Sequence, residues 1–227
     1  MKTVHSILSW LVTLLLPLTL VFLGMRLLFT NAYLQVEYRV PGFPPDDYGF
    51  TLGDRLHWSS LALQYLLNDA GISFLGNLKF PDGSPLYNER ELSHMHDVKA
   101  VVQPAMAIGY LAWAVVLGLG VWARWGGWWR KFVAGVRRGG WLTVGIVAAV
   151  GLLAGTDFWT FFSDFHGLFF NGNSWIFEYS DTLIRLFPIR FWEDAFLYIG
   201  VLAVAIGLLL GLALRPWKVK GVNPPKE

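Results

Sequence analysis

Four long apolar segments constrain this chain more than any other feature of its sequence. Each is long enough to cross about 30 Å of hydrocarbon as a helix of roughly 20 residues. Only 15% of the residues are charged, against about 25% in average soluble proteins. We therefore predict an all-α membrane protein, a four-helix transmembrane bundle that forms one domain over residues 1–227. The expected spans are residues 6–29, 101–123, 141–162 and 194–214.

The charged residues are divided unevenly between the connecting segments. Residues 124–140 contain five basic residues and no acidic one, whereas residues 30–100 and 163–193 contain more acids than bases. By the positive-inside rule, residues 124–140 and both termini are cytoplasmic, and residues 30–100 and 163–193 are extracytoplasmic. The first span exceeds the apolar length of a signal peptide, so we expect it to remain in the protein.

The first extracytoplasmic segment is too long for a simple connection, and we expect it to have structure of its own. Residues 31–47 are predicted to be extended. Thr51 and Asp54 form an N-cap pair, which predicts a helix that ends near Gly71. A further helix is expected from residue 88 into the second span. This segment is a structured insertion between the first two spans, and we expect it to cover the bundle.

Histidines are the strongest candidates for chemistry, because the chain has five of them and no cysteine. His94 and His96 point to different sides of the predicted helix, whereas His166 follows the third span. Because the His94 helix enters the second span from outside and His166 leaves the third span on the same side, we expect His94 and His166 to meet. The alternatives are a solvated, charged helix start around His94 and an interfacial aromatic belt around His166.

A metal site is a weaker interpretation of the same residues. His94, His96, Asp97 and His166 are of types that bind zinc. However, two histidines at positions i and i+2 of a helix point apart, and the HExxH spacing is absent. We expect no metal and no cofactor.

The chain resembles the bacterial lipoprotein intramolecular transacylase family, Lit, over nearly its whole length. The most specific elements are H-M-x-D-V, which begins at His94, and F-H-x-x-F-F, which begins at Phe165. They are accompanied by Phe50-Thr51, Arg55-Leu56, Tyr65-Leu66, Glu89 to Ser93, Trp175, Asp181 to Ile184, Leu186 to Pro188 and Phe191-Trp192.

This resemblance implies a multi-pass enzyme of the bacterial plasma membrane. The family converts diacylglyceryl-modified lipoproteins to the lyso form, by moving the sn-2 O-acyl chain of the lipidated N-terminal cysteine onto that residue's α-amino group. Its two catalytic histidines correspond to His94 and His166. His96 occupies the variable position of its motif and receives no role.

The chemistry of the residues agrees with such a reaction. An α-amine has a pKa of about 7.7–8.0 and must lose a proton before it attacks an ester. A histidine is a suitable base, and general base catalysis contributes roughly 10²- to 10⁴-fold in rate. The other histidine would assist the oxyanion and the leaving oxygen, although the sequence does not assign the two roles. Expected substrate-binding residues are Arg55, Arg90, Asp97, Phe165, Phe169, Phe170 and Asn173.

Two further functions compete with the transacylase. One is a non-enzymatic membrane assembly factor that binds lipid or lipoprotein in an aromatic groove. The other is a small transporter, but the spans carry no charge at mid-membrane and no pair of broken helices, which argues against it. The expected partners are lipoproteins and membrane lipid, and no nucleic acid.

Overall fold

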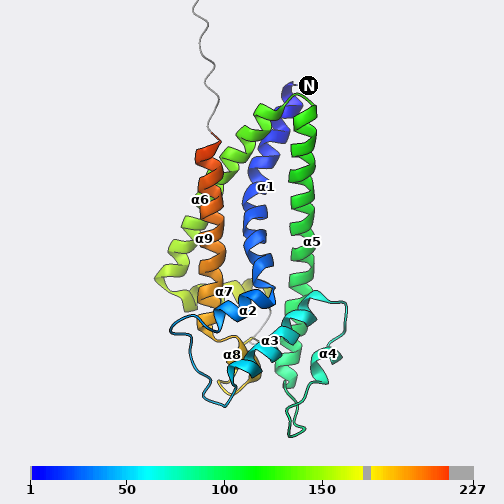
Figure 1. Cartoon of the computed structure of the whole chain (residues 1–227), viewed down its shortest axis with the longest axis vertical. Coiled ribbons are helices and arrows are strands. Elements are labelled where there is room, and N and C mark those ends of the chain that lie inside the picture. The colour runs from blue at the N-terminus through cyan, green and yellow to red at the C-terminus, as the bar shows by residue number, and fades with distance from the viewer. Residues whose placement is uncertain (1, 171–174, 215–227) are drawn as a thin grey trace, which may run out of the picture.

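The computed structural model describes residues 2–170 and 175–214, and the regular elements in these ranges are helices (Figure 1). Four of them are long and apolar enough to cross a membrane: α1 (Lys2–Leu28), α5 (Glu89–Trp125), α6 (Trp129–Thr156) and α9 (Ile189–Ala213). Helix α1 contacts each of the other three. The predicted all-α membrane bundle is therefore confirmed.

Helix α1 lies at the centre of the bundle. Half of its most apolar 18-residue stretch is buried, 50% against 17%, 17% and 22% for the other three long helices. Glycines of α6 permit this packing, because a Cβ atom added at Gly135 would lie 2.4 Å from the carbonyl oxygen of Ser9. Similarly, a Cβ atom at Gly140 would lie 2.6 Å from the carbonyl oxygen of Gly207 in α9. Such close approach of small residues stabilises helix pairs in lipid.

The third long helix differs from the expected span at residues 141–162. Helix α6 begins at Trp129, so most of the basic segment predicted as a loop lies on its first turns. It ends at Thr156, and Asp157 then caps a separate helix, α7 (Phe158–Phe169), by accepting a hydrogen bond of 3.1 Å from the backbone N–H of Thr160. The aromatic residues that extended the apolar pattern past position 156 belong to this second helix.

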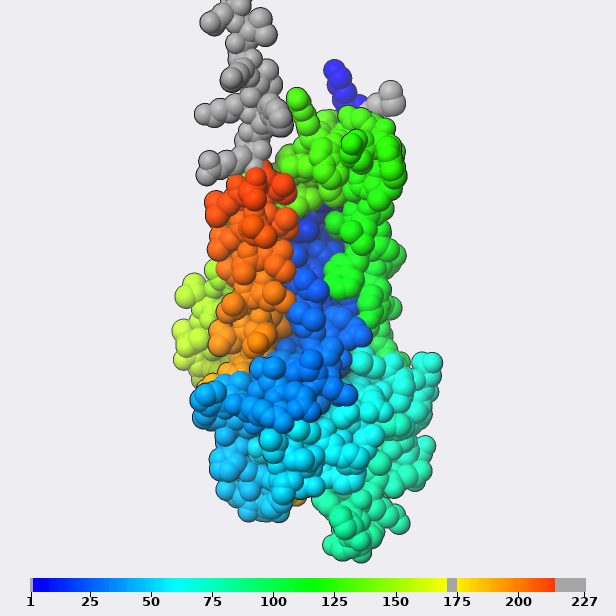
Figure 2. Space-filling view, viewed as in Figure 1, coloured from blue at the N-terminus to red at the C-terminus, as the bar shows by residue number. Residues whose placement is uncertain are grey.

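Residues 29–88, which we call the insertion, cover the end of the bundle opposite the N-terminus (Figure 2). The insertion contains α2 (Asn31–Glu37), α3 (Leu52–Leu67) and α4 (Ser73–Gly76). The prediction of extended chain over residues 31–47 is wrong for residues 31–37, because Thr30 caps α2 by accepting the N–H of Tyr33. One face of α2 is also buried, which favours the helix over the strand propensity of its residues.

The predicted start of α3 is confirmed. The Thr51 side chain accepts the backbone N–H of Asp54, and the Asp54 carboxylate accepts the backbone N–H of Thr51. The two bonds form a capping box. The helix ends at Leu67, four residues before the expected Gly71.

A short helix, α8 (Thr182–Leu186), attaches the chain before α9 to the insertion. The Tyr38 hydroxyl donates a hydrogen bond of 2.8 Å to the carbonyl oxygen of Leu186. Arg185 donates two hydrogen bonds of 3.0 Å to the Asp46 carboxylate, which is almost fully buried. These bonds join segments far apart in the sequence into one body around a core of Ala62, Tyr65, Leu66, Leu75, Leu86, Tyr87, Met95, Leu183 and Leu186.

Candidate active site

The start of α5 holds His94 in a fixed position. Asn88 and Glu91 form a capping box, in which one Glu91 oxygen accepts the backbone N–H of Asn88 at 2.8 Å. The other Glu91 oxygen accepts the backbone N–H of Leu183 at 2.7 Å. His94 follows one turn later and is 7% exposed. Its Nδ1 atom is buried and has no hydrogen-bond partner among the described residues.

Helix α7 holds the second histidine. His166 is 8% exposed, and its Nδ1 atom lies 2.8 Å from the carbonyl oxygen of Phe162, one turn earlier. A carbonyl oxygen only accepts, so Nδ1 must carry the hydrogen and donate it. In the neutral imidazole the Nε2 atom is then left with its lone pair, which can accept a proton.

The structure brings these two histidines together although they are 72 positions apart in the sequence. Their ring centroids are 6.2 Å apart, and the ring planes are inclined by 25°. The surrounding walls are aromatic: Phe170 and Phe177 lie 5.1 and 5.4 Å from the His94 ring, and Trp175 lies 4.8 Å from the His166 ring. The pair therefore has little contact with water and can act on one small group held between or beside the rings.

Burial lowers the pKa of the His166 imidazole below its usual value of 6.5, because the charged form loses hydration. The hydrogen bond to the Phe162 carbonyl opposes this change but does not cancel it. His166 is therefore neutral at pH 7, which is the state a general base requires.

The remaining predicted site residues lie at different distances from the histidine pair. Phe170 is buried beside both histidines, with its ring 5.7 Å from the ring of His166 and 5.1 Å from that of His94. Phe165 and Phe169 are 39% and 44% exposed, so they lie on the outer side of α7. Arg55 is buried elsewhere, in the insertion, where it donates to the Pro44 carbonyl oxygen at 2.7 Å. Asn173 lies outside the described residues.

The polar residues predicted near His94 have other partners. Arg90 donates a hydrogen bond of 2.8 Å to Asp181, and its guanidinium lies 5.9 Å from the Phe177 ring, at the edge of the site. Asp97 lies beside the exposed His96, with 3.5 Å between a carboxylate oxygen and Nδ1. No hydrogen bond joins Asp97 to His94 among the described residues. His96 is directed away from the pair, as its helix position indicates.

Phe177 is the wall residue that the sequence did not suggest. It follows Trp175 in a segment without helical or strand periodicity, so no pattern places it. The signal that could have found it is Asp181, four positions later, whose carboxylate accepts from both Asn88 and Arg90 of the α5 start. This contact holds the 175–181 segment against His94.

A second buried polar group lies where α2 packs against α9. Glu37 is 0% exposed, and neither carboxylate oxygen has a hydrogen-bond partner among the described residues. Burial and the charge of Asp194 raise the pKa of Glu37 from 4.5 to about 7. Asp194 is paired with Arg190 at 2.7 Å. In the same turn of α9, Trp192 reaches the His166 site, with its ring 6.0 Å from that of Phe162.

The model of one protein family, "Lipoprotein intramolecular transacylase Lit", matches residues 7–192 of this chain. A protein of Aquifex aeolicus (strain VF5) that bears the name "Uncharacterized protein" is 27% identical over 209 residues, which are 91% of this chain and 92% of that protein.

Two solved structures share the fold. The in meso structure of the membrane-integral lipoprotein intramolecular transacylase Lit from Bacillus cereus has a TM-score of 0.77 at 19% identity, and covers 92% of this chain and 94% of that chain. A variant of the same Bacillus cereus protein with one histidine replaced by arginine has a TM-score of 0.72 at 18% identity, with 94% and 92% covered. Because the family model spans most of the sequence, the chain belongs to the lipoprotein intramolecular transacylase family, Lit.

Proposed function

We propose that this protein moves the sn-2 O-acyl chain of a diacylglyceryl-modified lipoprotein onto the α-amino group of the same N-terminal cysteine, which gives the lyso form. The observation that carries the proposal is the buried pair of His94 and His166 rings, 6.2 Å apart at one end of a bundle of membrane-spanning helices. Family membership supports the same reaction.

In this proposal His166 is the general base. Its Nδ1–H is held by the Phe162 carbonyl, so the Nε2 lone pair is available to the substrate. The neutral α-amine attacks the ester carbonyl carbon and forms the new C–N bond, and Nε2 takes a proton from that nitrogen. The bond between the carbonyl carbon and the sn-2 oxygen then breaks. The leaving oxygen takes up one proton, so that no proton is gained or lost overall.

His94 is the proposed hydrogen-bond donor to the oxygens that become negative. A neutral imidazole has one N–H group, and in a site walled by Phe170 and Phe177 its hydrogen bond is not weakened by water. Because ester and amine belong to one molecule, positioning alone contributes several kcal/mol toward the barrier. Neither a metal nor a cofactor has a step in this reaction.

The proposed orientation puts the histidines on the extracytoplasmic side of the plasma membrane. The basic residues at the start of α6 lie at the N-terminal end of the molecule, where Lys131 donates a hydrogen bond of 2.6 Å to the carbonyl oxygen of Lys2. By the positive-inside rule this end is cytoplasmic. The insertion, the start of α5 with His94 and helix α7 with His166 lie at the opposite end (Figure 1), where lipoproteins are anchored in the outer leaflet. The exposed rings of Phe165 and Phe169 would contact the acyl chains there.

Replacement of each histidine tests the proposal. His94→Gln and His166→Gln variants are expressed in a bacterium that lacks this activity, and the lipoproteins are examined by mass spectrometry. Loss of general base catalysis lowers the rate by roughly 10²- to 10⁴-fold, so we expect no detectable lyso form from His166→Gln and a strong loss from His94→Gln. His96→Gln is the matched control, because this exposed ring lies on the same helix.

Normal formation of the lyso form by both variants would contradict the proposal. If, in addition, a bulky change at Phe165 abolished function, the non-enzymatic lipid-binding factor would be the better assignment.

A further inference from the structure

The end of the bundle that contains the N-terminus carries positive charge without acidic residues to neutralise it. Residues 1–36, 98–156 and 195–214 contain no Asp or Glu. These ranges include all of α1 and α6 and the parts of α5 and α9 that lie at this end. Residues 215–227 add four basic residues and only one acidic residue. The anion that balances these cations therefore does not come from the long helices.

Arg138 of α6 is well placed to hold a phosphate group. Its guanidinium donates hydrogen bonds to two hydroxyl oxygens of α1, at 2.8 Å to Ser9 and at 3.3 Å to Thr13. Its Cζ atom lies 4.2 Å from the centre of the Trp10 ring, within the range of a cation–π contact. A guanidinium has five N–H groups, so three of them have no partner among the described residues. The half-buried side chain is thus held in place and can still donate two parallel hydrogen bonds to a phosphate.

Lys131 lies on the same side of α6, two turns closer to the N-terminal end of the molecule. Seven positions in a helix return to nearly the same face, with a rise of about 10 Å. The Lys131 ammonium donates to the carbonyl oxygen of Lys2 at 2.6 Å and to the hydroxyl of Ser6 at 2.8 Å. These acceptors are neutral, and none of the ion pairs that the structure describes contains Lys131 or Arg138. Two uncompensated cations therefore lie along one edge of α1.

An exposed apolar ridge of α1 continues from these cations toward the middle of the bundle. Trp10, Leu14 and Leu18 follow one another at intervals of four residues, so they lie on one side of the helix. Their side chains are 56%, 65% and 41% exposed, although α1 is the most buried of the four long helices. A molecule with a negative head and an apolar chain could contact the cations and the ridge together.

This combination selects the class of ligand. A nucleic acid or an acidic protein could bind the cations, but neither has an apolar chain that would cover a ridge inside a membrane-spanning helix. A free phosphate would also leave the ridge uncovered. Basic sites between transmembrane helices at the cytoplasmic surface are suited to the headgroups of anionic lipids, and tryptophan is typical of the boundary between headgroups and hydrocarbon.

We propose that the edge formed by Lys131 and Arg138 of α6 and by residues 10–18 of α1 binds one anionic phospholipid of the cytoplasmic leaflet. The phosphate binds Arg138, Lys131 adds positive charge on the aqueous side, and one acyl chain lies along the ridge. The leaflet follows from the positive-inside rule. The site does not involve the histidine pair, which lies at the opposite end of the molecule.

Lipid binding to the purified protein in detergent, measured by native mass spectrometry, tests the proposal. One Lys or Arg near an anionic lipid headgroup contributes about fivefold in affinity. Lys131→Gln/Arg138→Gln should therefore weaken the binding of phosphatidylglycerol about 25-fold, and leave that of zwitterionic phosphatidylcholine unchanged. Thermal unfolding without added lipid shows whether the variant is folded. If it is not, Lys131→Gln alone should weaken phosphatidylglycerol binding about fivefold.

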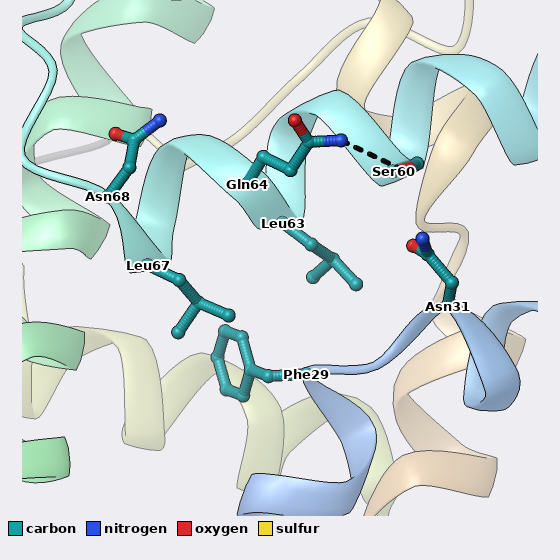
Figure 3. A pocket seen from close by; sticks show the side chains of 7 residues that line it. All are labelled: Phe29, Asn31, Ser60, Leu63, Gln64, Leu67 and Asn68. Carbon is teal, nitrogen blue, oxygen red and sulfur yellow. Dashed lines mark hydrogen bonds between the residues drawn. The ribbon is translucent and has the colours of Figure 1, made fainter.

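The matched control removes two cations from the opposite end of the molecule. Arg39 donates to the Gln35 carbonyl oxygen at 2.7 Å, and Lys99 donates to the Asn68 side chain at 3.2 Å. Asn68 lines a cavity between α3 and the link from α1 to α2 (Figure 3). Arg39→Gln/Lys99→Gln lowers the net charge by the same amount and should leave phosphatidylglycerol binding unchanged.

A phosphatidylglycerol with a photo-crosslinker in its acyl chain locates the bound lipid. We expect crosslinks within residues 10–18 of α1 that become weaker in the Lys131→Gln/Arg138→Gln variant. An equal loss of binding in the control variant, or no loss in either, would overturn the proposal. Crosslinks that miss α1, equal affinity for phosphatidylcholine, or equally tight binding of glycerol 3-phosphate, which has no acyl chain, would also overturn it.

Discussion

Replacement of Glu37 by glutamine should remove a pH dependence of stability that the structure builds into the α2–α9 contact. The Glu37 carboxyl is 0% exposed and lies near Asp194, so burial and the neighbouring negative charge both favour its protonated form. Glutamine has nearly the same shape as the protonated acid and cannot ionise. The variant therefore keeps the packing of α2 against α9 while it removes the titration.

The magnitude follows from the change in pKa. Folding raises the pKa of Glu37 from 4.5 to about 7, and such a difference corresponds to about 3 kcal/mol. The folded protein binds this proton more tightly than the unfolded chain does. The free energy of unfolding therefore falls as the pH rises from about 4.5 to about 7, and remains lower by about 3 kcal/mol above that range.

Thermal unfolding in detergent, followed by tryptophan fluorescence between pH 5 and 8.5, measures this effect. At a few degrees per kcal/mol for a chain of this size, the Tm of Glu37→Gln should exceed that of the wild type by roughly 6–12 °C at pH 8 and by little at pH 5. Glu89→Gln changes an exposed carboxyl and should follow the wild type. If Glu37→Gln shows the same decline in Tm with pH as the wild type, the carboxyl is not the protonated group that we describe.

Three further predictions address packing and chemistry. Gly109→Ala should destabilise the bundle by about 1–3 kcal/mol through overpacking, because its Cβ atom would lie 2.2 Å from the Phe22 ring. The control Gly145→Ala places a Cβ atom with nothing within 4 Å and should be neutral or slightly stabilising. Thermal unfolding measures both variants. Arg185→Met should cost about 3–5 kcal/mol, because it leaves a buried carboxylate without its partner; a change under 1 kcal/mol in chemical unfolding would contradict this. The kcat/KM profile should fall once below the amine pKa of about 7.7–8.0 and a second time below pH 6.5, where His166 takes up a proton, because burial lowers the pKa of His166; a second fall above pH 6.5 would argue against His166 as the base.

The sequence predicts the bundle well because hydropathy and length decide which helices can cross a membrane. It fails at the break between α6 and α7, where the apolar pattern continues through aromatic residues. The signal was present: Asp157 directly precedes an apolar run, and an aspartate in this position is typical of the residue that caps the start of a helix. Apolar periodicity alone cannot distinguish one long helix from two that share a boundary.

Helix α2 was missed for a different reason. Val36, Tyr38 and Val40 alternate as in a strand, and these residues and Tyr33 have high strand propensity. Helix forms because Thr30 provides a cap and because Tyr33, Leu34 and Glu37 are buried on one side of it. The rings of Tyr33 and Phe191 of α9 lie 5.5 Å apart, a contact between residues 158 positions apart that no local pattern contains.

The two histidines could be paired from the sequence because topology alone brings the start of one helix and the end of another to the same side of a membrane. The side chains that surround the two rings could not be predicted in this way. Trp175 and Phe177 reach the rings through an irregular segment that is held by Asp181, whose partners Asn88 and Arg90 lie more than 90 positions earlier. Patterns of period 2 or 3.6 carry no information about such contacts.

These surroundings also decide how the proposed reaction can work. A His166 imidazole with a pKa below 6.5 is a weaker base than the α-amine, whose pKa is about 7.7–8.0, so it cannot gain much by deprotonating a free ammonium group. The aromatic walls disfavour that ammonium as they disfavour a charged imidazole, and they therefore select the neutral amine, whose formation at pH 7 costs only about 1 kcal/mol. Once the amine has attacked the ester, its nitrogen becomes strongly acidic, and a neutral Nε2 of modest basicity is sufficient to take the proton. Burial of the pair thus suits removal of a proton from the nitrogen after the C–N bond has formed, rather than deprotonation of the free ammonium group before the attack.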